Sequence, residues 1–341
     1  MDQKFDPDTF RGSSRRRLMA AGAAAVASSW LPGAVRAQGA WPAKPIRIVA
    51  AQAPGSSNDA TARALAEYLT TKLKTPVVVE NKPGGIGMIA ADTVARSAPD
   101  GYTLLITLHS QLAQAPVLLK KPPLDPSKDL TPIGAFSTGV APVGVKKDLP
   151  VKNLKELIAL AKKRPVSVGN YGIGSSWQIM MTQLAKQTGA QFDLVNYKGT
   201  GPMVLDLMAG NIDVGAGSMA GMAAGIQRGA VRPIMLIYGD SKNPLLPGVP
   251  GWAEEGFVGP AFQDLKEYNM VLAPAGTSPE VVQRLAALIH GSATDSEKVK
   301  MVLDQLGVTE TPPTGPALKS LIAQTWPAYQ AMTQQLHLTV E

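Results

Sequence analysis

Short apolar runs alternate with longer amphipathic stretches along most of the chain. The segment 46–51 is apolar, 59–73 carries apolar residues at helical spacing, and 76–80 is rich in valine. Patterns of the same two kinds predict a helix over 86–96 and a strand over 102–108. This β-α-β-α-β order predicts a mainly parallel sheet that is covered by helices.

A second set of alternating units follows the proline-rich segment 121–132. It opens with a strand-like segment over 133–145, and we expect a new sheet to start near residue 140. The pattern then predicts helices over 154–163, 176–187 and 202–209, and strands over 166–170, 192–196, 212–215 and 233–238. A loop-rich stretch over 239–267 ends this part of the chain.

The C-terminal part is predicted to hold one strand, over 270–273, and three helices over 279–293, 297–306 and 317–336. Because these helices have no strands of their own to cover, we expect the chain to return to the first sheet. The predicted fold class is therefore α/β, with two domains joined by two crossings: 38–139 plus 270–341, and 140–269. Clefts between such domains, beside the carboxyl ends of parallel strands, are where small ligands bind.

The N-terminal segment 1–37 has the pattern of an export signal. Three arginines at 15–17 precede an apolar stretch over about 18–31, and the small Ala37 offers a cleavage point. The paired arginines resemble a twin-arginine signal, with the general secretory route as the alternative. A transmembrane anchor is disfavoured, because the apolar run is shorter than about 20 residues and is interrupted by Pro32. We expect the mature protein to be periplasmic.

Composition narrows the possible functions. The 341 residues include no cysteine, so disulfides, thiolate nucleophiles and cysteine-bound metals are excluded. The formal net charge is +7, and it falls to +4 without the predicted signal, which carries six basic and three acidic residues. Since no cluster of basic residues with interleaved aromatics is present, we expect no nucleic-acid partner. The mild positive charge suits small anions.

Two loops that lead from a strand into a helix are candidate anion sites. The first is 53–59, where Ser57 or Asn58 can cap the helix, and the second is 171–176. The unpaired N–H groups and positive end of a helix N-terminus favour a carboxylate or phosphate. Each loop can also be an ordinary capped turn. The two helix starts, one from each predicted domain, are expected to face each other across the cleft.

Further residues are candidates at the same cleft. In 198–202, Thr200 can cap a helix and Lys198 offers a charge, with a solvated lysine as the alternative. The backbone at 215–218 is also predicted to approach a ligand in the cleft, with packing of a helix as the alternative. Three aromatic residues, Tyr171, Trp177 and Tyr268, fall near the predicted cleft edges, where they either cover a ligand or pack in the core.

Catalytic groups are scarce. The histidines His109, His290 and His337 are far apart, and neither a zinc-protease motif nor a nucleophile elbow is present. Only His109, just past a predicted strand, is expected near the cleft. The run 85–90 reads G-x-G-x-x-A but is separated from its strand by three residues, which argues against dinucleotide binding. An exported α/β enzyme and a structural envelope protein remain alternative functions.

Seven segments, in this order, resemble the extracytoplasmic solute receptors of the tripartite tricarboxylate transporter family, also called Bug receptors. The segments are P-G-S-S-N-D (54–59), V-V-V-E-N-K-P-G-G-I-G (77–87), A-P-D-G-Y-T-L-L (98–105), Y-G-I-G-S-S (171–176), N-Y-K-G-T-G-P (196–202), L-M-A-G-N-I-D-V (207–214) and L-A-P-A-G-T-S-P (272–279). Together they cover nearly all of the chain that follows the predicted signal.

The resemblance implies a type II periplasmic-binding-protein fold: a hinged, monomeric clamshell without catalysis or cofactor. It implies a small carboxylate ligand, and membrane transporter subunits or a sensor protein as partners. The hinge would lie near 138–141 and 267–271, and Asp59 would shape the first loop. The predicted ligand-binding residues are Gly55, Ser56, Ser57, Asn58, Asp59, His109, Tyr171, Gly174, Ser175, Ser176, Trp177, Lys198, Thr200, Gly217, Ser218 and Tyr268.

Three positions depart from the family pattern. Relatives commonly carry an aspartate where this chain has Gly217, a histidine where it has Gln178, and a different segment at 110–115. Because no carboxylate stands at position 217 to hold an amino group, we expect a plain organic acid, aliphatic or aromatic, as the ligand.

Overall fold

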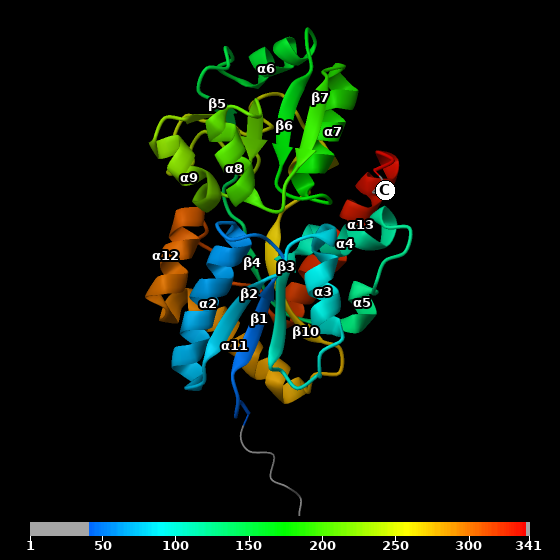
Figure 1. Ribbon diagram of the computed structural model, residues 1–341, viewed down its shortest axis with the longest axis vertical. Coiled ribbons are helices and arrows are strands. Elements are labelled where there is room, and N and C mark those ends of the chain that lie inside the picture. Colours follow the sequence, from blue (N-terminus) through cyan, green and yellow to red (C-terminus); the bar gives the residue numbers. More distant parts are fainter. Residues whose placement is uncertain (1–40, 339–341) are drawn as a thin grey trace, which may run out of the picture. The chain divides into compact units, whose positions relative to one another are not determined.

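The computed structural model describes residues 41–338, so the predicted export signal lies outside the described part. From Pro42 onward the chain forms one compact unit, which contains two five-stranded sheets flanked by helices (Figure 1). We call the first sheet and its helices the first lobe, and the second sheet and its helices the second lobe. None of the helices in residues 41–338 has the length and apolar character needed to cross a membrane.

The first sheet has the strand order β2-β1-β3-β10-β4. Its strands are β1 (Ile46–Ala50), β2 (Val77–Asn81), β3 (Thr103–Leu108), β4 (Leu130–Ser137) and β10 (Tyr268–Pro274). β1 lies parallel to both β2 and β3, with Ile46 opposite Val77, whereas β10 runs antiparallel to its neighbours β3 and β4. Four strands therefore point the same way, which matches the predicted, mainly parallel sheet.

The second sheet repeats this plan in the order β7-β6-β8-β5-β9. Its strands are β5 (Pro142–Lys146), β6 (Val166–Asn170), β7 (Phe192–Asn196), β8 (Val214–Ala216) and β9 (Val231–Leu236). Here β5 is the antiparallel strand, in the same fourth position that β10 holds in the first sheet. In both sheets the antiparallel strand is the one that enters from the other lobe.

The single strand predicted over 133–145 is wrong, because the segment is divided between the two sheets as β4 and β5. At the crossing, the N–H of Thr138 donates to the carbonyl of Glu267 and that of Val140 donates to the carbonyl of Leu306. Gly139 between them has a φ of +64°, which turns the chain out of the first sheet. The break lies close to residue 140, where a new sheet was expected to start.

The first lobe holds helices from both ends of the chain. They are α2 (Ser57–Leu73), the 3-10 helix η2 (Gly85–Gly87), α3 (Met88–Ala95), α4 (His109–Leu118), α5 (Pro126–Asp129), α11 (Pro279–Asp295), α12 (Glu297–Leu306) and α13 (Gly315–Gln335). Helices α11 and α13 pack on β4, and α12 packs on α2, as expected for C-terminal helices that return to the first sheet. Helix α4 was not predicted, because no side chain caps its start and Pro116 interrupts its pattern.

The second lobe holds α6 (Leu154–Ala161), α7 (Ser176–Thr188), α8 (Thr200–Ala209), α9 (Met219–Gln227) and α10 (Pro260–Gln263). Its core contains fully buried valines of β5, β6 and β8 together with Trp177. The Trp177 indole N–H donates to the carbonyl of Gly169 at 3.2 Å, so this ring is part of the core. Of its two predicted roles, core packing is the one that its surroundings favour.

Candidate functional site

Helix starts from both lobes meet at a small cavity. Ser57 at the start of α2 lines it from the first lobe, and Thr200 at the start of α8 and Ser218, the residue before α9, line it from the second. Thr200 does not cap α8 as predicted, because it is the first residue of the helix and the N-cap is Gly199, which has no side chain to cap it. The volume of about 20 Å³ has room for roughly one water. The two lobes are therefore closed on each other with little space left between them.

The loop before α2 is held by reciprocal hydrogen bonds. The Ser56 hydroxyl accepts the N–H of Asp59 at 3.2 Å, and the Asp59 carboxylate accepts the N–H of Gly55 at 3.2 Å. Asp59 is also paired with Arg63 at 2.9 Å and accepts a hydrogen bond from Asn81. These bonds all lie inside the first lobe, so Asp59 has the contacts of a loop-shaping residue.

The loop before α7 is built the same way. The Ser175 hydroxyl accepts the N–H of Gln178 at 3.3 Å, and the Gln178 side chain accepts the N–H of Gly174 at 2.8 Å. Ser175 also donates to Asn170 at 2.7 Å and is fully buried. Both predicted loops therefore begin a helix with a serine cap, but in the first loop the cap is Ser56, and the predicted caps Ser57 and Asn58 are the first two residues of the helix itself.

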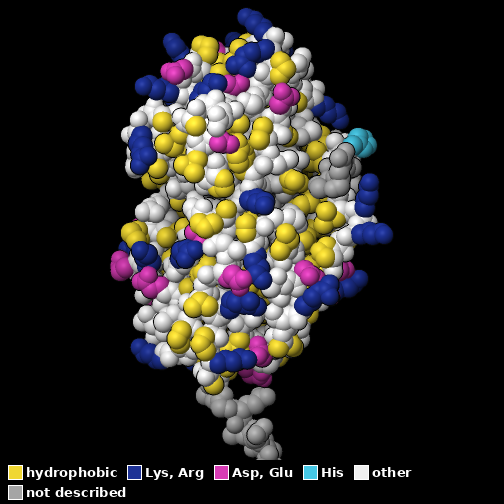
Figure 2. All heavy atoms as spheres, viewed as in Figure 1, with side chains coloured by type: hydrophobic (Ala, Val, Ile, Leu, Met, Phe, Trp, Pro, Cys, Tyr) yellow, Lys and Arg dark blue, Asp and Glu magenta, His cyan; other side chains and the backbone are white. Residues whose placement is uncertain are grey.

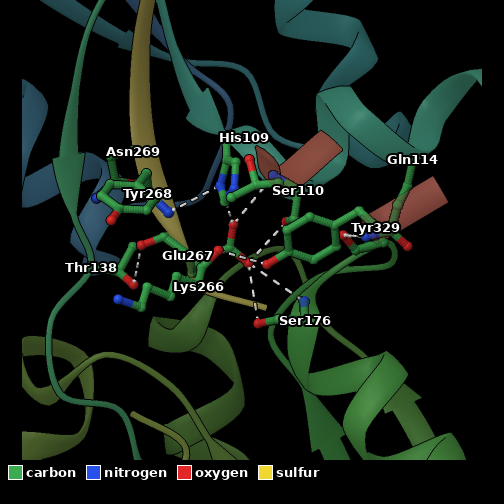
Figure 3. Close-up of polar contacts among 12 residues, drawn as sticks. His109, Ser110, Gln114, Thr138, Ser176, Lys266, Glu267, Tyr268, Asn269 and Tyr329 are labelled. Carbon is green, nitrogen blue, oxygen red and sulfur yellow. Dashed lines mark hydrogen bonds and ion pairs between the residues drawn. The ribbon is translucent and has the colours of Figure 1, made fainter. Parts of the chain in front are cut away.

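The carboxylate of Glu267 lies at the start of α7 (Figure 3). One of its oxygens, Oε2, accepts the backbone N–H of Ser176 at 3.5 Å and the Ser176 hydroxyl at 3.3 Å. The same oxygen accepts the Ser110 hydroxyl at 2.9 Å, and Oε1 accepts the Ser110 N–H at 3.3 Å. An anion from the chain itself therefore lies where sequence reasoning placed the ligand's carboxylate.

Two tyrosines complete the surroundings of Ser176. The hydroxyl of Tyr171 lies 3.1 Å from the Ser176 hydroxyl, and that of Tyr238 is also hydrogen-bonded to it. Burial, and then the charge of Glu267, raise the pKa of Tyr171, so this phenol stays neutral and can donate. Since Ser176 uses its single proton toward the acceptor-only carboxylate, it accepts hydrogen bonds from both tyrosines.

His109 is buried behind Glu267 and lines neither the small cavity nor the larger one described below. Its Nδ1 accepts the N–H of Tyr268 at 3.1 Å and lies 3.2 Å from Oε1 of Glu267. The ring packs edge-on against Tyr268 and Tyr329. In this closed form, His109 is a core residue that touches the site through Glu267. The exposed His290 and His337 lie far along the chain in the C-terminal part.

Glycine at position 217 has a steric reason. A Cβ on Gly217 would lie 2.4 Å from the methyl carbon of Thr200 and 2.5 Å from its hydroxyl oxygen. Any larger residue at position 217 would displace the Thr200 side chain from the cavity. The glycine at 217 and the place of the Thr200 side chain are therefore coupled by packing.

Lys198 is exposed and lines a separate hollow beside Gly84–Gly87. Its carbonyl accepts the N–H of Ala53, which ties the loop before α8 to the loop before α2. On the face shown in Figure 2, basic and acidic side chains are interspersed. Lys198 is not among the residues that line the small cavity in this closed form.

A larger cavity of about 440 Å³ lies beside the two crossings. Its lining is mixed and includes the aromatic residues Trp252, Phe262 and Tyr268 together with the charged residues Lys266 and Glu310. It shares Tyr238 and Glu267 with the small cavity. Tyr268 thus faces this space, and the two cavities meet at the residues around Ser176.

Sequence reasoning missed Glu267, Tyr238 and Ser110. The only signal for Glu267 was its place at the second predicted crossing, because a lone glutamate before a strand usually faces water. Among residues 41–338, no group of histidine and acidic side chains is arranged to hold a metal ion.

Comparisons with known proteins agree with the predicted family. The sequence profile described as "Tripartite tricarboxylate transporter family receptor" matches residues 61–338. Protein BugT of Bordetella pertussis is 32% identical over 91% of this chain and 95% of its own length. The structure of periplasmic binding protein BugD has a TM-score of 0.79 at 29% identity, covering 88% of this chain and all of BugD. The R. palustris protein Rpa4515, solved with adipate, has a TM-score of 0.76 at 26% identity, over 87% of this chain and 97% of its own.

Proposed function

Because the chain belongs to the tripartite tricarboxylate transporter family of receptors, we propose that it binds a small organic carboxylate between its two lobes. Its fold is the two-domain fold of periplasmic binding proteins, as predicted, and it is a solute-binding receptor. A periplasmic location is supported by these relatives. The family assignment gives no support to the alternative of an exported enzyme.

The observation that carries the proposal is the meeting of helix starts at the small cavity. Ser57, Thr200 and Ser218, which are hydroxyl-bearing residues, line the cavity; Ser57 and Thr200 are the first residues of their helices, and Ser218 is the N-cap of α9. Within the described residues, no hydrogen bond uses the backbone N–H of Ser57 or of Thr200. Unpaired N–H groups at positive helix ends are the usual donors to a carboxylate.

Ligand exchange requires the lobes to open, because the closed cavity is too small for an organic acid. We place the hinge at the two crossings, 138–141 and 267–271, and the lobe boundaries near 139/140 and 269/270. Contacts from both lobes to one ligand would favour closure. The adipate bound to Rpa4515 is one example of an acid held by a relative.

The remaining parts of the proposal concern export and partners. Residues 1–37 would direct export and be cut near Ala37, by the twin-arginine or the general secretory route. The receptor would work as a monomer and hand its acid to membrane transporter subunits or to a sensor protein. No cofactor, metal or nucleic acid takes part in this proposal.

A thermal-shift screen of the exported protein against mono-, di- and tricarboxylates, aromatic acids and amino acids tests the function. An acid at 100 times its dissociation constant should add about 2.7 kcal/mol to the free energy of unfolding, a shift of several degrees. Mass spectrometry of acids released from the purified protein is the companion measurement. The proposal would be overturned if no acid gave a thermal shift and no acid co-purified with the protein.

A further inference from the structure

We propose that Glu267 makes the cleft selective for ligands with a single carboxylate and excludes dicarboxylates. This inference rests on the proposed function. Glu267 stands at the start of β10, where the chain crosses between the lobes, and is only 3% exposed. Its carboxylate lies between the starts of α4 and α7 (Figure 3).

The hydrogen bonds of Glu267 are those that a bound anion would make. Ser110, in the first turn of α4, belongs to the first lobe, and Ser176, the first residue of α7, belongs to the second. Each serine gives both its N–H and its hydroxyl, over 2.9 to 3.5 Å. Since the start of α4 has no side-chain cap of its own, Glu267 supplies the anion for both helix ends.

No cation balances this carboxylate on the cavity side. Glu267 is the one charged residue among the described residues that line the small cavity. His109, whose Nδ1 accepts the N–H of Tyr268 and lies 3.2 Å from Oε1 of Glu267, lines neither cavity. The amine of Lys266 points away from the carboxylate (Figure 3).

This arrangement leaves one place for a ligand's carboxylate. The start of α7 is taken by Glu267, whereas the starts of α2, α8 and α9 meet at the small cavity with unpaired N–H groups at Ser57 and Thr200. The other end of a ligand bound there would face Glu267. A second carboxylate at that end would be repelled, since two like charges about 6 to 10 Å apart at an effective dielectric constant of about 20 cost about tenfold or more in affinity.

Matched pairs of acids test the inference. Calorimetric titration of the exported protein with hexanoate and adipate, and with pentanoate and glutarate, compares ligands that differ by one carboxylate. We expect the monoacid of each pair to bind about tenfold or more tightly than the diacid. Equal affinities, or tighter binding of the diacids, would overturn the inference, and the wild-type protein is sufficient for this test.

The variant Glu267→Gln removes the charge and keeps the shape of the side chain. We expect the ratio between hexanoate and adipate to fall to about threefold or less, because the repulsion is gone. The control Glu310→Gln, at the edge of the larger cavity, should keep the wild-type ratio. An unchanged ratio in folded Glu267→Gln protein contradicts the inference, whereas the absence of binding by any acid to either protein contradicts the proposed function itself.

Discussion

The start of α2 and the start of α7 have nearly the same local sequence and the same local structure, but only the start of α7 binds the carboxylate of a distant residue. Gly-Ser-Ser occupies 55–57 in the first lobe and 174–176 in the second. In both, the first serine caps the helix, and the residue three places later accepts the N–H of the glycine. This local arrangement is therefore decided by the sequence of five residues.

What differs is the partner of the second serine. Ser57 lines the small cavity and its backbone N–H is unpaired within the described residues, whereas the N–H and hydroxyl of Ser176 bind Glu267. Glu267 is 91 residues away from Ser176 in the chain. A helix start that is ready for an anion thus does not reveal whether the anion is a ligand or a side chain.

The largest difference in stability between the two helix starts should come from the residue that follows the second serine, which is Asn58 in α2 and Trp177 in α7. Trp177→Ala removes a fully buried indole from the second-lobe core and should cost about 3–5 kcal/mol in free energy of unfolding. The matched change Asn58→Ala breaks the hydrogen bond to Asn269 and should cost about 1–3 kcal/mol. Urea unfolding of both variants measures the difference, and equal losses would mean that Trp177 is not a core anchor.

Alanine at the two loop glycines should separate local strain from contact between lobes. Gly55 has a φ of +82° and Gly174 a φ of +71°, so either change should cost about 1–2 kcal/mol of backbone strain. A Cβ at 174 would also lie 2.9 Å from Ile86 in the first lobe, whereas one at 55 lies 3.7 Å from Gly201.

Small-angle scattering of the ligand-free protein checks this second effect. Gly174→Ala should open the lobes and raise the radius of gyration, while Gly55→Ala should leave it at the wild-type value. If both variants scatter like the wild type, the contact of the α7 loop with the first lobe does not control closure.

The two serine caps should be of equal strength. Ser56→Ala and Ser175→Ala each remove one hydroxyl that accepts a backbone N–H, which should cost about 1 kcal/mol in either lobe. Chemical denaturation of the two variants, with Ser127→Ala on exposed α5 as a reference, gives the values. A difference between the caps well above 1 kcal/mol would break the equivalence of the two starts.

The smallest expected effect is a pH dependence that is specific to the second lobe. Burial opposes ionisation of Asp213, but the hydrogen bonds and charges of Arg164 and Lys146 outweigh it and lower its pKa from 3.8. This stabilisation is present above pH 3.8 and is lost as the pH falls through the lower, folded value.

Acid unfolding followed by hydrogen exchange locates this effect. Amides of β6 and β8, which flank Asp213, should lose protection at low pH in the wild type. Asp213→Asn should lower their protection at neutral pH and flatten its dependence on acid. Loss confined to the first lobe would contradict the assignment.

Most of the secondary structure could be predicted from the chain itself, since apolar periodicity and capping residues are local signals. The strand Val166–Asn170, for example, has the predicted bounds, and the helix after Ser175 begins as its cap indicates. The new sheet expected near residue 140 does start there with β5, but the strand-like segment 133–145 was drawn as one run, because both halves are apolar and only the sheets to which they belong distinguish them.

The tertiary structure decided what occupies the candidate site. Glycine at 217 follows from the position of Thr200, and the buried charge at α7 follows from a strand that returns from the other lobe. Capping is a contact over three residues, so the sequence determines it. The place of Glu267 depends on where two crossings bring distant segments together, and no local pattern encodes that.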